Sequence, residues 1–246
     1  MAHPAAVMGR STAAFGIAAL LIGDMCLPAR ATEATASPAA MSASELGARL
    51  HFLEQRLNAG QPTALAWEWG WTGLHAVEFT RNMSDAINAD EGDNRVRAIV
   101  DAAKSGLATV QMGLLLGDPL GAGDGAGPMW AVPGDDRAAR LQRLAVGERQ
   151  LMANAERAET RYSVSRHLVT VGANLLGGAA ILAFGDSRDA VRSTLVGLAV
   201  GEAQIWSQPW RATADLRDYR ATFPKTPEIT WELRPMGSGL RLAIHF

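Results

Sequence analysis

The stretch from Leu168 to Gly185, LVTVGANLLGGAAILAFG, runs for 18 residues without a charged side chain. Its length approaches the roughly 20 residues that a helix needs to cross a bilayer, and so much apolar surface gains free energy when it leaves water. The turn over 186–189 then leads into a second apolar helix over 190–208. Helices joined by so short a turn pack antiparallel, so we expect a helical hairpin that is buried either in a protein core or in lipid.

A second helical hairpin is predicted in the first half of the chain. Ser42 and Glu45 have the spacing of a capping box, and leucines follow at helical intervals up to Pro62. Because proline interrupts the hydrogen-bond ladder of a helix, we expect the first helix to end there. Two further helices, over 63–89 and about 94–116, are separated by a short turn and form the hairpin.

The remaining segments are less regular. Residues 117–134 hold many glycines and three prolines, which predicts a long loop with Trp130 as its packing anchor, and a charged amphipathic helix starts after Asp136. The tail over 229–246 alternates apolar and polar residues, a pattern typical of a β-hairpin that closes over the helices. The predicted fold class is an all-α bundle of about six helices, built from two helical hairpins, with a small C-terminal β-hairpin.

The first 31 residues have the three parts of a secretory signal peptide. Arg10 provides the positive start, residues 13–22 form the apolar stretch, and Ala29-Arg30-Ala31 is an A-x-A cleavage site. The apolar stretch is too short to span a bilayer comfortably, so an uncleaved anchor is the weaker alternative. The only cysteine, Cys26, lies in the part removed, so we expect no disulfide in the mature chain.

These patterns predict an exported protein of the periplasm or of an envelope membrane. We expect residues 1–31 to be removed, 32–41 to be a disordered lead, 42–222 to form the helical domain and 223–246 to form the tail with the β-hairpin. Export would leave the mature chain with a formal charge of −3, because Arg10, Arg30 and Asp24 are lost with the signal. This balance predicts no nucleic-acid partner.

The chain lacks the sequence motifs of common enzyme classes. The glycine-rich stretch has no G-K-[ST] ending for phosphate binding, and neither G-x-S-x-G nor H-E-x-x-H occurs. We therefore predict no catalytic residue, no cofactor and no metal.

Five polar residues on apolar helices are nevertheless candidates for a site: Glu68, His75, Glu78, Asn174 and Glu202. His75 and Glu78 have the i, i+3 spacing found on metals in carboxylate-rich bundles, and Glu68 is seven residues before His75. The alternative is a structural cluster of paired interior groups, in which Glu202 contacts Asn174, or an end residue such as Arg192 or His167. The structural alternative is favoured, because an unpaired buried carboxylate costs several kcal/mol.

Small residues of the hairpin over 168–208 predict close helix packing. The glycines concerned are Gly172, Gly177, Gly178, Gly197 and Gly201. Glycines spaced four apart let two helix backbones approach, both in membranes and in water-soluble bundles. Only the first arm reaches spanning length without a charge, since the second begins with Arg192 and contains Glu202. Membrane insertion and burial in a soluble bundle therefore both stay open.

The segment VGEAQIWSQPWRATADLRDYR, over 200–220, together with the upstream helical hairpins, resembles a group of exported helical proteins of Gram-negative bacteria that have no known activity. The resemblance implies an envelope location and assigns no catalytic residue.

The function expected from the sequence is a non-catalytic structural or interaction role in the cell envelope. One alternative is a membrane-embedded helical-hairpin protein that oligomerises through 168–208. The other is a metal-dependent enzyme of the helical-bundle type that uses Glu68, His75 and Glu78 with Glu202. The partners expected are an envelope protein or a second copy of the chain, with membrane contact through 168–208.

Overall fold

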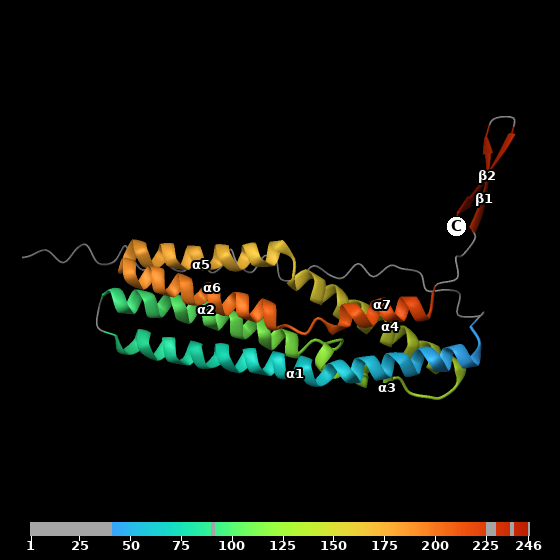
Figure 1. The fold of residues 1–246 in the computed structure, drawn as a ribbon, viewed down its shortest axis with the longest axis horizontal. Helices are drawn as coiled ribbons and strands as arrows, with labels where there is room; N and C mark the ends of the chain where they lie inside the picture. The colour runs from blue at the N-terminus through green and yellow to red at the C-terminus, as the bar shows by residue number, and fades with distance from the viewer. Residues whose placement is uncertain (1–40, 90–91, 225–229, 237–238, 246) are drawn as a thin grey trace, which may run out of the picture.

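The computed structural model of the chain describes residues 41–89, 92–224, 230–236 and 239–245. The helices form an elongated body along which α1 (Ala43–Asn88) runs from end to end (Figure 1). The other helical elements are α2 (Asp93–Leu116), η2 (Ala122–Asp124), α3 (Gly127–Trp130), α4 (Arg137–Arg161), α5 (Val164–Phe184), α6 (Ser187–Ser207) and α7 (Arg211–Thr222). The predicted signal peptide over 1–31 lies outside the described residues, as does the predicted lead over 32–41 except Met41.

The body has two halves that differ in construction. In the core half, the first part of α1 (residues 43–62) packs with α3, α4 and α7. In the hairpin half, the second part of α1 (residues 63–88) pairs with α2, and α5 pairs with α6. The two predicted helical hairpins are thus confirmed, and α2 lies against the α5–α6 pair.

The core half contains the cluster of buried hydrophobic side chains found among the described residues. Leucines of α1 at helical spacing, beginning with Leu46, meet Leu144 and Leu151 of α4 and Tyr219 of α7. The side chain of Ser42 caps α1 by accepting a hydrogen bond from the backbone N–H of Glu45 at 3.1 Å, as the sequence predicts. The start of α1 is therefore fixed both by its cap and by its leucine face.

The predicted helix end at Pro62 was wrong, because α1 continues through this residue for 46 residues in all. Tertiary contacts hold the helix on both sides of the proline. The loop over 121–126 lies against α1 there, where Asn58 Oδ1 accepts from the backbone N–H of Ala126 at 2.8 Å. Gln61 Nε2 donates to the carbonyl of Gly123 at 3.1 Å. These contacts offset the roughly 3 kcal/mol that an interior proline costs a helix.

The predicted packing anchor of the glycine-rich segment was also wrong. Trp130 is exposed, with the Arg143 guanidinium 5.0 Å from its ring centroid. Its neighbour Met129 is fully buried instead, and its sulfur lies directly over Gly147 of α4. Because Gly147 has no side chain, the short helix α3 can bring a methionine into the core, and the bulkier tryptophan stays outside.

The prediction of a C-terminal β-hairpin as part of the fold was wrong, because the packed body is an all-helical bundle to which the tail adds nothing. Strands β1 (Thr230–Met236) and β2 (Gly239–His245) pair antiparallel only with each other, from Thr230 opposite His245 to Met236 opposite Gly239. They project away from the helices and cover none of them (Figure 1). An isolated two-stranded hairpin is marginally stable in water, so the alternation of the tail adds no layer to the fold.

Candidate functional site

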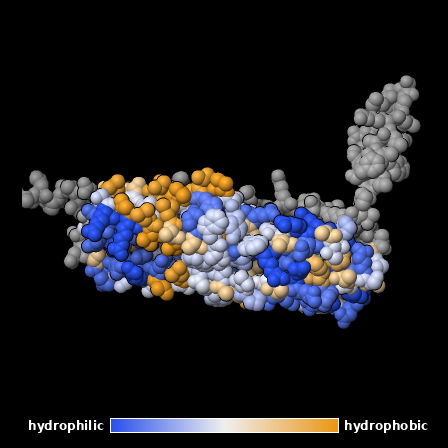
Figure 2. All heavy atoms as spheres, viewed as in Figure 1, coloured by the Kyte–Doolittle hydropathy of each residue, from blue (hydrophilic) through white to orange (hydrophobic). Residues whose placement is uncertain are grey.

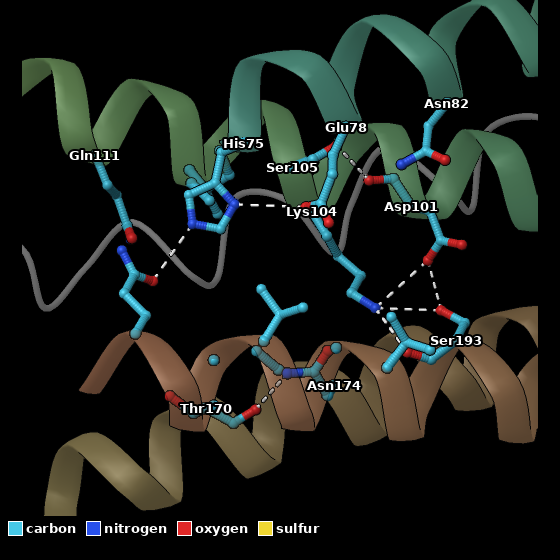
Figure 3. Close-up of a pocket in the computed structure, with 18 of the residues that line it drawn as sticks. His75, Glu78, Asn82, Asp101, Lys104, Ser105, Gln111, Thr170, Asn174 and Ser193 are labelled. Atoms are coloured by element: carbon cyan, nitrogen blue, oxygen red, sulfur yellow. Dashed lines mark hydrogen bonds and ion pairs between the residues drawn. The ribbon is translucent and has the colours of Figure 1, made fainter. Parts of the chain in front are cut away.

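A groove between the two helical hairpins contains three of the five predicted site residues. Its volume is about 360 Å³, and α1, α2, α5 and α6 all contribute side chains to it. His75 and Glu78 enter from α1 and Asn174 from α5 (Figure 3). The groove therefore forms only when both hairpins are packed together.

A network of charged and hydroxyl groups links α2 to α6 in this groove (Figure 3). Lys104 Nζ lies 3.5 Å from Asp101 Oδ1 and donates to Ser193 Oγ at 3.2 Å, while Ser193 Oγ donates to Asp101. Closer to the hairpin turns, Arg97 Nε lies 3.4 Å from Asp189 Oδ2. The sequence analysis missed this network, although a lysine and an aspartate at i, i+3 on an apolar helix were a signal of an interior pair.

His75 connects α1 to α6. Its side chain is buried, Nδ1 lies 3.6 Å from Glu78 Oε2, and Nε2 lies 3.4 Å from Gln204 Oε1. Its ring also lies against the ring of Trp71, with centroids 5.7 Å apart. The predicted pairing of His75 with Glu78 on one helical face is thus present, and it serves an interhelical contact.

Asn174 and the glycines lie where α5 and α6 approach each other. Asn174 Nδ2 donates to the carbonyl of Thr170 at 2.9 Å, and its Oδ1 presses against Gly197 of α6. A Cβ at Gly201 would collide with Thr170. A Cβ at Gly178 would likewise collide with Thr194. These glycines permit the close approach that the sequence predicts.

The two remaining glycine candidates behave differently. Gly177 faces α2, because a Cβ there would lie 3.1 Å from the Cδ of Lys104. A Cβ at Gly172 would meet nothing within 4 Å, so this glycine takes no part in helix packing.

Glu202 lies apart from the groove and forms an ion pair across the α5–α6 hairpin. Its Oε2 lies 2.8 Å from Nδ1 of His167, and both side chains are partly exposed. The predicted contact of Glu202 with a residue near the end of the other arm is confirmed for His167. This arrangement accounts for a carboxylate on an apolar helix without any chemistry.

Glu68 belongs to a different cavity, at the junction of the two halves. This junction cavity has a volume of about 550 Å³ and lies between α1, α4 and the segment from the end of α6 into α7. Burial raises the pKa of the Glu68 carboxyl above its ordinary value. Burial, together with the charge of Arg157, lowers the pKa of the Arg161 guanidinium on the facing wall to about 10.

The four residues of the predicted metal site are therefore not brought together. Glu68 faces the junction cavity, His75 and Glu78 face the groove, and Glu202 pairs with His167. Among the described residues, no group of three or more histidine, cysteine, aspartate or glutamate side chains is close enough to hold a metal ion.

The outer surface of the hairpin half is apolar. Hydrophobic side chains gather over the end of the molecule where α5 lies (Figure 2). The large exposed ones on α5 and α6 that do not line the groove are Val164, Leu168, Leu175, Leu176, Leu182, Phe184, Val191, Leu195 and Trp206. We call this set the hairpin face. In the described part of the chain, Asn94–Leu116 and Val164–Phe184 are long and apolar enough to cross a membrane by length and composition.

A scan against protein-family models, a search of curated proteins and a search of solved structures each found no match to this chain. The resemblance to exported helical proteins therefore stays a prediction.

Proposed function

We propose that the protein is a non-catalytic component of the cell envelope that inserts its α5–α6 hairpin into a lipid bilayer through the hairpin face. The observation that carries this proposal is the exposure of α5. Only 22% of its most apolar 18-residue window is buried in the molecule. The core helix of a water-soluble protein would be mostly buried, so this apolar helix needs a covering that the described part of the chain does not supply.

The length of the uncharged surface fits a bilayer. The sequence from Leu168 to Phe184 holds no charged residue, and as a helix it extends for about 26 Å. The hydrocarbon core of a bilayer is about 30 Å thick. A shorter exposed patch would favour a protein partner, whereas the length of this one is close to the thickness of the hydrocarbon core.

Different side chains mark the two ends of the hairpin face. Trp206 is exposed at the end of α6, and Trp69 is exposed at the same level of α1, where Trp71 Nε1 donates to Ser207 Oγ at 3.0 Å. Exposed Arg188 lies at the opposite end, beside the hairpin turn. Tryptophan is enriched at membrane interfaces and charged groups lie beyond the hydrocarbon, so both ends fit a membrane boundary.

Polar groups are gathered on the groove side instead. Asp101, Lys104 and Ser193 satisfy one another between the hairpins, as polar groups of membrane bundles do. Arg81, Arg166 and Arg192 also line the groove, and their guanidinium groups have no hydrogen-bond or ion-pair partner among the described residues. We therefore assign the lipid contact to the hairpin face and not to the groove side.

A matched pair of substitutions tests the proposal. Ala179 on α5 and Ala145 on α4 are both exposed alanines on helices, the first between Leu176 and Leu182 of the hairpin face and the second on the core half. A lysine in the middle of a membrane helix costs about 2.5–3.5 kcal/mol on insertion, whereas an exposed lysine in water costs less than about 0.5 kcal/mol.

We expect wild-type protein and Ala145→Lys to stay with the membrane pellet through a carbonate wash, and Ala179→Lys to be released. Release of the wild-type protein by carbonate would contradict the proposal and favour a soluble envelope protein. Equal retention of both variants would contradict a lipid position for α5.

A further inference from the structure

The junction cavity contains a largely buried carboxylate, Glu68, that makes no direct hydrogen bond to a described side chain. Glu68 is 7% exposed, and its carboxylate is influenced by the charges of Arg161 and Arg157 without a direct hydrogen bond or ion pair to a described side chain. Gly123 lies directly against Glu68 Oε2 and offers no side chain to it. A buried acceptor without a donor costs free energy, so its retention needs a reason.

A second unsatisfied acceptor lines the same cavity. Gln208 is 2% exposed, and its Nε2 donates to the carbonyl of Ala158 at 3.4 Å. This bond fixes the orientation of the amide and leaves Oε1 buried without a partner in the described part of the chain. Glu68 thus presents an acceptor to the cavity, whereas Gln208 Oε1 is enclosed beside it.

Arg161 also lines the cavity, and its side chain has hydrogen-bond donors where the other two residues have acceptors. Its guanidinium carbon lies 5.2 Å from the ring centroid of Trp67, and no carboxylate among the described residues lies within ion-pair distance of it. The neighbouring Arg157 differs, because it is satisfied by Asp118, Leu120 and Asn154. Arg161 therefore has free N–H donors, held in position by a tryptophan.

We propose that the junction cavity binds a small molecule carrying both an ammonium group and a carboxylate, of the size of an amino acid or a dipeptide. The ammonium group would donate to Glu68, and the carboxylate would accept from Arg161. A volume of about 550 Å³ is within the range of small-molecule sites, roughly 300–1,000 Å³. Arginine and carboxylate groups pair in two parallel hydrogen bonds, which would fix the orientation of the ligand.

Binding is tested with purified full-length protein and a panel of the twenty L-amino acids and their glycyl dipeptides, by thermal shift and then by titration calorimetry. We expect at least one of these probes to bind. Its N-acetyl and carboxamide derivatives, which each lack one charge, should bind at least tenfold more weakly. The proposal is overturned if no probe binds at 5 mM, or if the N-acetyl derivative binds as tightly as the parent.

Variants assign the two ends of the ligand. Glu68→Gln should weaken binding at least tenfold, whereas the matched change Glu159→Gln, at an exposed carboxylate of α4 outside the cavity, should leave binding unchanged. Arg161→Met should weaken binding of the parent probe and have no effect on its carboxamide. Equal affinity of Glu68→Gln and wild-type protein would show that Glu68 is only a structural group.

A pH series on wild-type protein keeps the test valid even if a variant folds poorly. Because the ammonium group pairs with ionised Glu68, affinity should fall as the pH is lowered towards the pKa of Glu68. Affinity that is constant from pH 8 to pH 5 would contradict the assigned role. A lipid contact by the hairpin face is not required for any of these results.

Discussion

In the core half, leucines of α1 and α4 are buried and the exposed face of α4 carries charged residues such as Arg149 and Glu156. In the hairpin half the distribution is inverted. Leu175 and Leu195 are exposed, while Asp101 and Lys104 face the groove between the hairpins. The first pattern is that of a domain in water, and the second is that of helices with an apolar surrounding. The proposed insertion therefore requires one chain to combine the packing rules of two solvents.

Polar groups also differ between the halves in how they are satisfied. In the core half, the Tyr219 hydroxyl donates to Glu148, whose Oε1 lies 3.6 Å from Arg49 Nη1. Burial, with this hydrogen bond, raises the pKa of Tyr219. At the junction of the halves, Glu68 and Arg161 influence each other's charge but make no direct side-chain hydrogen bond among the described residues. A complete network stabilises packing, whereas an incomplete one is the place where a ligand gains affinity.

The largest expected contrast comes from shortening a leucine in each half. Leu53→Ala should lower the free energy of unfolding by about 3 kcal/mol, because this side chain is fully buried in the core cluster. Leu195→Ala, at an exposed position of α6, should change it by less than about 0.5 kcal/mol in water. Chemical denaturation of both variants in the same buffer measures the two values. Similar losses would contradict the division into two halves.

A smaller contrast is expected within the α5–α6 hairpin. Gly201→Leu should cost about 1–3 kcal/mol, because a Cβ there already collides with Thr170. Gly172→Leu, where a Cβ meets nothing within 4 Å, should not lower stability, because leucine has a higher helix propensity than glycine. Thermal melting monitored by circular dichroism provides the comparison. If both substitutions lower the melting midpoint equally, close packing at Gly201 is not what holds the hairpin.

The smallest effect concerns the pH dependence of stability at Glu68. Its pKa is raised in the folded protein, chiefly by burial, so the folded state binds this proton more tightly than the unfolded chain. Its contribution to stability therefore improves as the pH falls from 7 towards the ordinary pKa of 4.5. We expect the free energy of unfolding of Glu68→Gln to lie within about 1 kcal/mol of the wild-type value at pH 7. The variant should lack the gain in stability that Glu68 contributes as the pH falls. An identical pH dependence of unfolding in both proteins would contradict the raised pKa.

Periodicity predicted the helices well because each helix carries its own apolar face. It failed at Pro62, where the loop over 121–126 stabilises a helix that the local sequence disfavours. It failed at Trp130 because Met129, and not the tryptophan, packs over Gly147 of a distant helix, a contact that no local pattern records. It failed for the tail because alternation of apolar and polar residues indicates strand pairing but does not indicate whether the paired strands pack against the helices.

The candidate site was predicted only where its residues are close in the sequence or in one hairpin. The pair of His75 with Glu78 is local, and the pair of Glu202 with His167 lies within one hairpin. Glu68 shares a helical face with His75, but seven residues separate them by about 10 Å along α1, and they face different cavities. Contacts between distant segments, such as Lys104 with Ser193, could not be predicted in this way. The local sequence shows only a charged residue on an apolar helix and does not identify its partner.

Cysteine labelling tests the two-solvent account most directly, because Cys26 is the only cysteine of the chain and can be replaced by serine. In that background, Ala179→Cys on α5 and Ala145→Cys on α4 place one thiol on each half, both at exposed positions. Reconstituted vesicles are then treated with a membrane-impermeant maleimide. We predict rapid labelling of Ala145→Cys and protection of Ala179→Cys until detergent is added. Equal labelling of both thiols in intact vesicles would contradict the account and place the hairpin half in water.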